Sequence, residues 1–206
     1  MFTRLVLLVV AGLLPHLAHA EPPKRTAVAV RVYNTARIAA EILDRAVGVA
    51  AQTIEASRLN VAWWNCDADT ACGRPPSSGE LVLRLVRAPR APADVNQLVL
   101  GEAFIDTVAR EGVLATIYID RVALMANVSD TDATSLLGRA IAHEVGHLLR
   151  ASNAHSARGL MRARWSPDDL RRNEVGDWVL TEDDAVAIRR RLGNFTHDNR
   201  EEHTVP

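Results

Sequence analysis

Apolar residues recur along the chain in patterns that predict strands and helices. The segment 27–33 alternates β-branched and other residues as a strand does, with Val28, Val30 and Val32 on one face. From residue 35 to 56 the apolar positions recur every three to five residues, which predicts an amphipathic helix. Further strands are predicted over residues 59–64, 81–86, 98–105 and 113–119.

The order of these elements indicates the fold class. One strand, one long helix and then several strands favour an α/β (α+β) sandwich. Segment 81–86 is nearly continuous in apolar character, with Arg84 as the exception, so it is expected to be an inner strand covered on both faces. The polar stretch 106–112 separates the last two strands, 98–105 and 113–119, which therefore pair as neighbours or form a hairpin.

A second helix is predicted around the segment that carries the clearest chemistry. Polar residues 129–132 offer helix caps, and an apolar stripe follows them. His143 and His147 are four residues apart, so on a helix both imidazoles project from one side and can reach one ion. Glu144 lies about a hundred degrees further around the axis, where it can take a proton from a water beside the ion. This is the H-E-x-x-H arrangement of zinc proteases.

A catalytic zinc ion usually has three protein ligands and one open position, so a third ligand is expected. His155 lies eight residues after His147, beyond a polar stretch that can end the helix and return the chain to the metal. Asn153 has the spacing at which many related enzymes place the third histidine, but a neutral amide oxygen is a poor zinc donor. Glu174 would suit the class of zinc proteases that takes a downstream glutamate from a second helix. His155 is favoured, with Glu174 as its main competitor.

The stretch from His143 to Met161 resembles a known family. It is similar to the metzincin pattern H-E-x-x-H-x-x-G-x-x-H followed by a methionine turn, and most similar to the matrixin type, including Ser156 and Leu160. The resemblance implies a metzincin-like single domain, with a mixed twisted sheet, an active-site helix and a C-terminal helix. It also implies that Met161 lies beneath the metal site, whereas the residue alone is equally compatible with an ordinary core methionine.

Two positions depart from the family pattern. Arg150 stands where the family has glycine, and the third histidine comes two residues late. Glycine is needed at that position because the chain leaves the helix in a left-handed conformation; a longer connector can move this turn, and Asn153 tolerates it well. Further on, segment 180–188 is similar to the start of the matrixin C-terminal helix, where an Asp-Asp pair, here Asp183 and Asp184, helps to secure the methionine turn.

The N-terminus predicts export. Arg4 precedes an apolar run over residues 5–14, and residues 18–20 form the small-x-small pattern that signal peptidase cuts. A run of roughly ten apolar residues is too short to span a bilayer, so we expect a cleaved signal peptide over residues 1–20 and no stable membrane insertion afterwards. The mature protein is then secreted or periplasmic.

The two cysteines agree with an oxidising compartment. Cys66 and Cys72 are close in sequence, and in an exported protein such a pair is expected to form a disulfide that closes a short loop. The predicted domain covers residues 21–193, of which 21–75 either belong to the catalytic domain or include a short pro-region. A flexible polar tail is expected over residues 194–206.

The charge balance excludes one class of partner. Lys and Arg number 24 against 25 for Asp and Glu, so no global field would recruit nucleic acid or an acidic membrane surface. The fractions of hydrophobic residues, 48%, and charged residues, 24%, are those of an ordinary globular protein.

The residues therefore predict a secreted, zinc-dependent endopeptidase that acts on polypeptides. His143, His147 and His155 would hold Zn²⁺, and Glu144 would be the general base for a water that the metal activates. Metzincins generally seat an extended substrate along a sheet edge, for which 113–119 is the candidate, although it serves equally well as an internal strand. Two alternatives remain: a catalytically silent zinc-binding protein, and a non-peptide metal-dependent amidase. The sequence does not predict the oligomeric state.

Overall fold

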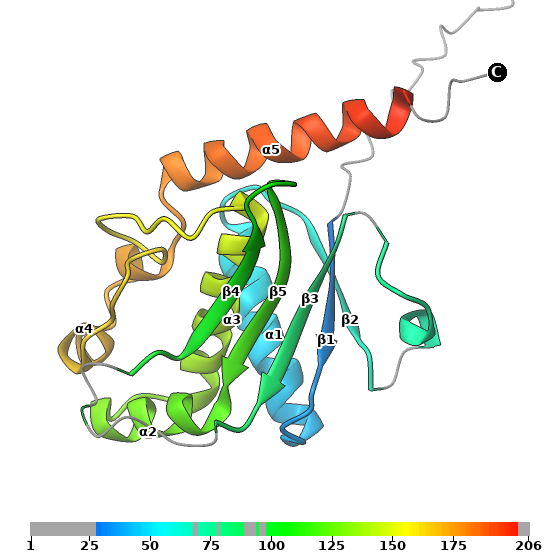
Figure 1. Ribbon diagram of the computed structural model, residues 1–206. Coiled ribbons are helices and arrows are strands. Elements are labelled where there is room, and N and C mark those ends of the chain that lie inside the picture. The colour runs from blue at the N-terminus through cyan, green and yellow to red at the C-terminus, as the bar shows by residue number, and fades with distance from the viewer. Residues whose placement is uncertain (1–27, 68–69, 78, 89–93, 95–97, 202–206) are drawn as a thin grey trace, which may run out of the picture.

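Five strands form one mixed, twisted sheet in the order β2-β1-β3-β5-β4 (Figure 1). In this computed structural model, residues 28–67, 70–77, 79–88, 94 and 98–201 are described, so the predicted signal peptide lies outside the described residues. Neighbouring strands run parallel except for β4, which is antiparallel to β5. The predicted α/β class and the mixed sheet are thus confirmed. The strands are β1 (Val28–Tyr33), β2 (Val61–Asn65), β3 (Glu80–Val86), β4 (Gly101–Asp106) and β5 (Glu111–Tyr118).

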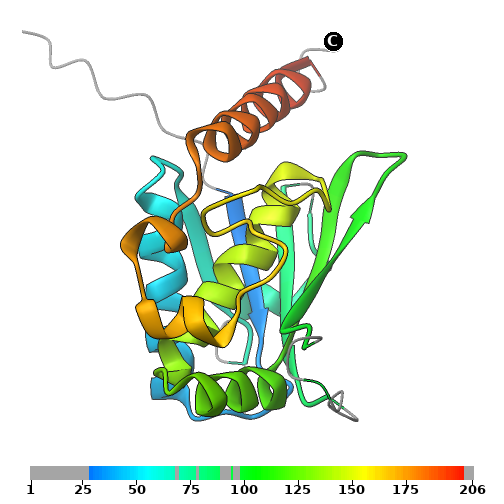
Figure 2. The ribbon, with the colours of Figure 1, turned by 90° about the vertical axis from the view of Figure 1, so that its left-hand side faces the viewer.

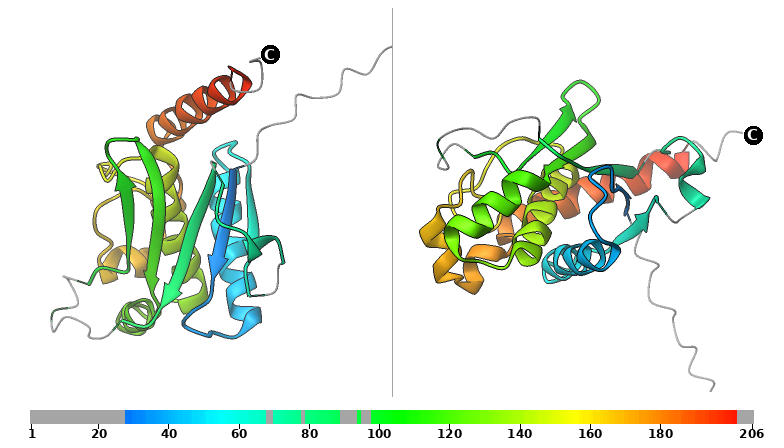
Figure 3. Two further views of the ribbon diagram at one scale, coloured as in Figure 1. Left: turned by 45° about the vertical axis from the view of Figure 1, so that its right-hand side comes forward. Right: turned by 90° about the horizontal axis from the view of Figure 1, so that it is seen from below.

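Two long helices cover one face of the sheet, α1 (Ala40–Glu55) and α3 (Ala133–Arg150) (Figures 1 and 3). The apolar faces of both helices are buried against the inward side of the strands, where Leu83 and Ile117 are fully buried. This burial is the main source of stability for the sandwich. The helix α1 begins later than predicted because the Asn34 side chain bonds both the N–H and the carbonyl of Ile38 and holds a turn there.

Further helical segments precede and follow α3 in the sequence. Helix α2 (Ile119–Ser129) follows β5 directly and was not predicted, because a short helix that begins on a strand end carries little periodicity of its own. The segment after α3 contains α4 (Pro167–Arg172) and the 3-10 turn Val175–Trp178. The long helix α5 (Glu182–Glu201) continues into the segment predicted as a flexible tail, while the domain boundaries remain predictions.

The edge strand next to α3 is β4, and the prediction that 113–119 forms the edge is wrong. Strand β5, which contains most of that segment, pairs with β3 on one side and with β4 on the other. The polar stretch between β4 and β5 closes a hairpin, so β4 folds back onto the free side of β5 and takes the edge position. No further strand pairs with β4 among the described residues.

A loop covers part of the other face of the sheet. Cys66 and Cys72 form the predicted disulfide in this loop, with Cα atoms 5.4 Å apart. Arg31 on β1 is fully buried and donates to the carbonyl of Arg74 at 2.6 Å, and its guanidinium also lies 2.7 Å from the Glu80 carboxylate. The loop is therefore tied to the sheet by the disulfide and by the hydrogen bond from buried Arg31, while the Arg31–Glu80 ion pair joins β1 to the start of β3. Within the described residues, no helix is long and apolar enough to cross a membrane.

Candidate metal centre

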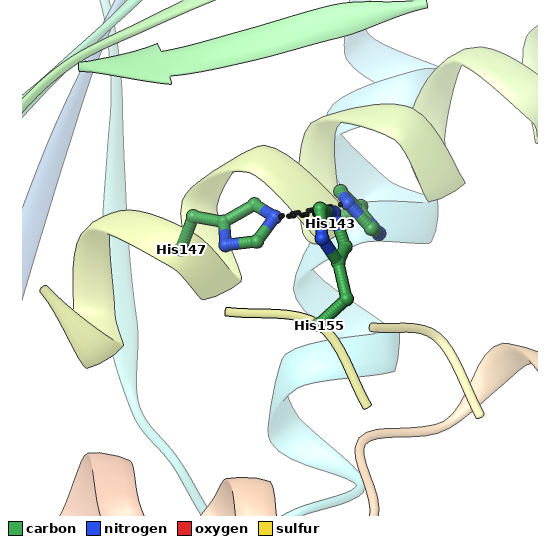
Figure 4. A group of neighbouring side chains, drawn as sticks. All are labelled: His143, His147 and His155. Atoms are coloured by element: carbon green, nitrogen blue, oxygen red, sulfur yellow. Dashed lines mark hydrogen bonds between the residues drawn. The ribbon is translucent and has the colours of Figure 1, made fainter. Parts of the chain in front are cut away.

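Three histidine side chains converge beside the C-terminal half of α3. The helix is capped by Asp132, whose carboxylate accepts from the N–H of Ser135 at 2.6 Å. His143 and His147 lie on one side of α3, and His155 reaches them from the segment that follows the helix (Figure 4). The three residues form a group whose ligand atoms all lie within 4.8 Å of one another. The structure thus brings together the three histidines that the sequence singled out.

The hydrogen bonds of the two helical histidines determine which nitrogens face each other. Nδ1 of His143 lies 2.8 Å from the carbonyl oxygen of Leu160, and Nδ1 of His147 lies 2.7 Å from that of Ser152. A carbonyl oxygen only accepts, so both Nδ1 atoms carry the proton and donate. Each Nε2 is then left with a lone pair that points into the group, as metal ligation requires.

The spacing of these nitrogens fits a bound cation. Nε2 of His147 lies 3.1 Å from Nε2 of His143 and 3.3 Å from Nε2 of His155. Two lone pairs 3.1 Å apart repel unless a positive charge lies between them. Burial lowers the pKa of His143 to about 3 and that of His147 to about 4, so both are neutral at physiological pH and available as ligands. Three neutral imidazoles are a donor set that zinc prefers.

Glu144 lies next to this group in a buried position. Its side chain is 7% exposed, and burial, reinforced by the charge of Glu102, raises its carboxyl pKa to about 8. Strand β4 packs directly over it, because a Cβ added at Gly101 would lie only 2.7 Å from Cγ of Glu144. The glycine therefore allows the edge strand to approach the carboxylate closely.

An open cleft of about 570 Å³ gives access to these side chains. Its walls come from residues 98–103 on one side and residues 162–165 on the other, and its floor includes Glu144 and the three histidines. Figure 2 shows these two segments on either side of α3. The cleft places a carboxylate and a triad of imidazoles where a bound molecule can meet both.

Met161 packs against α3 at Gly146. It is fully buried, and a Cβ added at Gly146 would lie 2.6 Å from its sulfur atom. Gly146 therefore leaves the space that the methionine side chain occupies. The position agrees with a methionine turn below the histidines, and that role remains a prediction for Met161.

Gly146→Ala is expected to destabilise the protein by about 1–3 kcal/mol, because the added methyl group overpacks the contact with buried Met161. Urea unfolding of the metal-free protein measures the change. Gly48→Ala is the matched control: it lies on α1 with nothing within 4 Å of the added Cβ, so alanine should leave stability unchanged or raise it by up to about 1 kcal/mol. Equal effects at both positions would contradict the close packing of Met161 on α3.

The chain leaves α3 earlier than expected. Arg150 is the last helical residue, and Ala151, with φ 46° and ψ 47°, adopts the left-handed conformation. The prediction that Asn153 takes this turn is wrong, since its φ is not positive. The N–H groups of Ala151 and Ser152 must satisfy the last carbonyls of the helix, so the turn comes directly after the helix ends. Arg150 keeps helical geometry and therefore does not need to be glycine.

Of the pair Asp183 and Asp184 near the start of α5, only Asp184 is buried. Its carboxylate accepts from Oγ1 of Thr181 at 2.6 Å and from Oγ of Ser156 at 2.7 Å, while Asp183 is exposed. Thr181 accepts in turn from the N–H of Asp184 at 3.2 Å, as an N-cap does. Asp184 therefore connects α5 to the residue that follows His155.

Glu174, the competing ligand, lies in a different environment. Its side chain is 69% exposed and its carboxylate is 3.7 Å from Nε of Arg172. It is not part of the group formed by the three histidines.

Sequence reasoning missed the aromatic wall of the cleft. The ring of Trp165 meets His143 edge to face, with centroids 5.4 Å apart, and packs in the same way on Trp178 at 5.3 Å. Neither tryptophan lies at a sequence spacing from the histidines that would identify it as part of the site. Gly101 was missed for the same reason, because its role depends on the approach of β4 to α3.

Comparison with known proteins gives a match at the level of the fold. The structure is similar to archaemetzincin from Methanopyrus kandleri, with a TM-score of 0.50 and 17% sequence identity over 83% of this chain and 98% of that chain. No protein-family model matches the sequence, and no curated protein matches it. The likeness shows that the chain has the mixed α/β fold of archaemetzincin.

Proposed function

We propose that this protein is a secreted zinc-dependent endopeptidase. The observation that carries the proposal is the convergence of three histidine Nε2 atoms beside a buried glutamate in an open cleft. A structural zinc site is usually closed by four protein ligands, whereas three ligands in a cleft leave a position for water or substrate. The fold shared with archaemetzincin and the disulfide, which is typical of an oxidising compartment, support the same proposal.

His143, His147 and His155 would hold the metal through Nε2. Zinc in this position would supply a Lewis acid that polarises the scissile carbonyl and makes a water more acidic. The carbonyls of Leu160 and Ser152 would keep two of the imidazoles in the correct tautomer and orientation.

Glu144 would transfer a proton from the attacking water to the leaving amine. As general base it takes a proton from the attacking water, and as general acid it passes that proton to the leaving amine. Burial suits this role, because it raises the pKa of the carboxyl group to about 8 with the help of the Glu102 charge, whereas a zinc ion held by the neighbouring histidines would favour the ionised form. A carboxyl group balanced in this way can both accept and release a proton near neutral pH.

The edge of β4, which pairs with no further strand of the described chain, offers a place for a polypeptide substrate. An extended peptide can add to an exposed sheet edge through main-chain hydrogen bonds. Residues 98–103, which lead into and form part of β4, line the cleft directly beside Glu144. A peptide along β4 would therefore pass over the histidine group. The similarity of the sequence around His155 and Met161 to the matrixin pattern supports the proposed peptidase function.

Incubation of the purified mature protein with a broad peptide library, with and without a chelator, tests the function. We expect cleavage of internal peptide bonds by protein that contains one zinc ion, and its loss when the chelator removes the metal. Zinc binding without any turnover would favour a silent zinc-binding protein. Hydrolysis of small amides without cleavage of peptides would favour an amidase, and either result would contradict the peptidase proposal.

A further inference from the structure

The two departures from the metzincin pattern meet at one buried carboxylate. Arg150, which stands where the family has glycine, places its guanidinium 2.9 Å from Oδ1 of Asp184. The side chains are only 14% and 2% exposed, so this pair is shielded from water and weakly screened by salt. A buried carboxylate without a cationic partner is strongly destabilised, so Arg150 stabilises Asp184 in its buried position.

Asp184 in turn holds the residue next to the third histidine. Its Oδ1 accepts from Oγ of Ser156 at 2.7 Å, and the N–H of Ser156 donates to the carbonyl of Met161 at 2.8 Å. Ser156 is therefore held both through its side chain and through its backbone. Because Arg150 precedes the connector and Ser156 follows it, Asp184 closes the connector 151–155 at both ends.

His155 depends on this arrangement more than the other two histidines do. His143 and His147 each bond a backbone carbonyl through Nδ1, which fixes the orientation of the ring. The ring of His155 is exposed and, among the described residues, its hydrogen-bonding contact is with His147. The position of His155 must therefore come from its backbone, and the backbone is held through Ser156.

We propose that Arg150 is a positioning residue for His155. Its ion pair with Asp184 orients the carboxylate that holds Ser156, and thereby fixes a ligand connector that is two residues longer than in the metzincin pattern. The glycine of the family is replaced because the left-handed turn moves to Ala151, which leaves position 150 free for a side chain that reaches Asp184. This inference rests on the proposed zinc site.

Zinc affinity of Arg150→Ala tests the proposal. Outer residues that orient a metal ligand typically contribute 10- to 100-fold to affinity, so we expect a loss of that order in competition with a chromogenic chelator. The visible absorption spectrum of the cobalt-substituted protein should also change, because a displaced His155 alters the ligand geometry. Arg150→Lys keeps the charge and should recover part of the affinity. Arg87→Ala, which removes an exposed ion pair with Asp120, is the matched control and should change neither the zinc affinity nor the cobalt spectrum.

A double-mutant cycle separates positioning of His155 from a general loss of stability. If Arg150 acts through His155, Arg150→Ala should weaken zinc binding no further in a His155→Ala background. Ser156→Ala removes only one hydroxyl group and serves if Arg150→Ala does not fold; we expect a loss on the order of tenfold. The proposal would be overturned if folded Arg150→Ala or Ser156→Ala kept the zinc affinity and the cobalt spectrum of the wild type. It would also be overturned if Arg150→Ala lost the same amount of zinc affinity with His155 present and with His155 replaced by alanine. Zinc binding by the wild type without peptide cleavage would overturn the peptidase function alone.

Discussion

Glu144→Gln is expected to reduce kcat/KM for peptide hydrolysis by about 10⁴ or to background, while one zinc ion per chain stays bound. Proton transfer by a positioned side chain typically contributes about 10²–10⁴ to the rate, and glutamine can neither accept nor return the proton. Glutamine has nearly the shape of glutamate, so it should fit below Gly101, where β4 packs on this side chain. Steady-state kinetics and metal analysis on the same preparation measure both quantities.

The control for Glu144→Gln is Glu182→Gln. Glu182 is an exposed carboxylate near the start of α5, where it pairs with Arg189, and its substitution should leave rate and zinc content unchanged. Full activity in Glu144→Gln would contradict proton transfer by this residue. Loss of zinc together with activity would instead show that the residue acts on metal binding, contrary to its place beside the histidine group.

His155→Ala is expected to weaken zinc binding by more than about 100-fold, so that extensive dialysis removes the ion, and Glu174→Ala is expected to retain it. Removal of a direct ligand should cost more affinity than the 10- to 100-fold typical of an outer partner, because only two imidazoles remain. Glu174 has an exposed side chain beside Arg172 and does not belong to the histidine group, so its loss should not reach the metal. Zinc content after extensive dialysis, measured by atomic spectroscopy, distinguishes the two variants.

The reverse result would change the classification of the protein. Loss of zinc in Glu174→Ala with retention in His155→Ala would mean that a downstream glutamate is the third ligand, as in a different clan of zinc proteases. The segment that carries Glu174 would then have to rearrange, since it now forms the entry to the 3-10 turn Val175–Trp178. If both variants retained zinc equally well, the result would contradict a site with three protein ligands.

Local features of this protein followed from the sequence because they depend on residues a few positions apart. Helical periodicity alone places His143 and His147 on one side of α3 with Glu144 beside them. The strands β1, β2 and β3 lie close to their predicted ranges, since the alternation or continuity of apolar residues reflects local burial. The disulfide between Cys66 and Cys72 spans six residues and needed no knowledge of the fold.

The approach of His155 to the other histidines was predictable in part. Its spacing after a polar stretch indicated a return of the chain toward the helix, and it joins the group as expected. The path of the return was not predictable. The left-handed turn falls on Ala151 and not on Asn153, because the end of α3 is decided by which N–H groups reach its last carbonyls.

Features that join distant segments were decided only by the tertiary structure. The edge position of β4 depends on whether a hairpin folds back onto β5, and a strand pattern is the same at an edge as inside a sheet. The pair Arg150–Asp184 and the contact of Gly101 with Glu144 join residues more than thirty positions apart. By itself the sequence determined the histidine-glutamate motif on its helix, because helix geometry is local. The chain's packing alone decided what surrounds the motif, because long-range contacts leave no periodic signal.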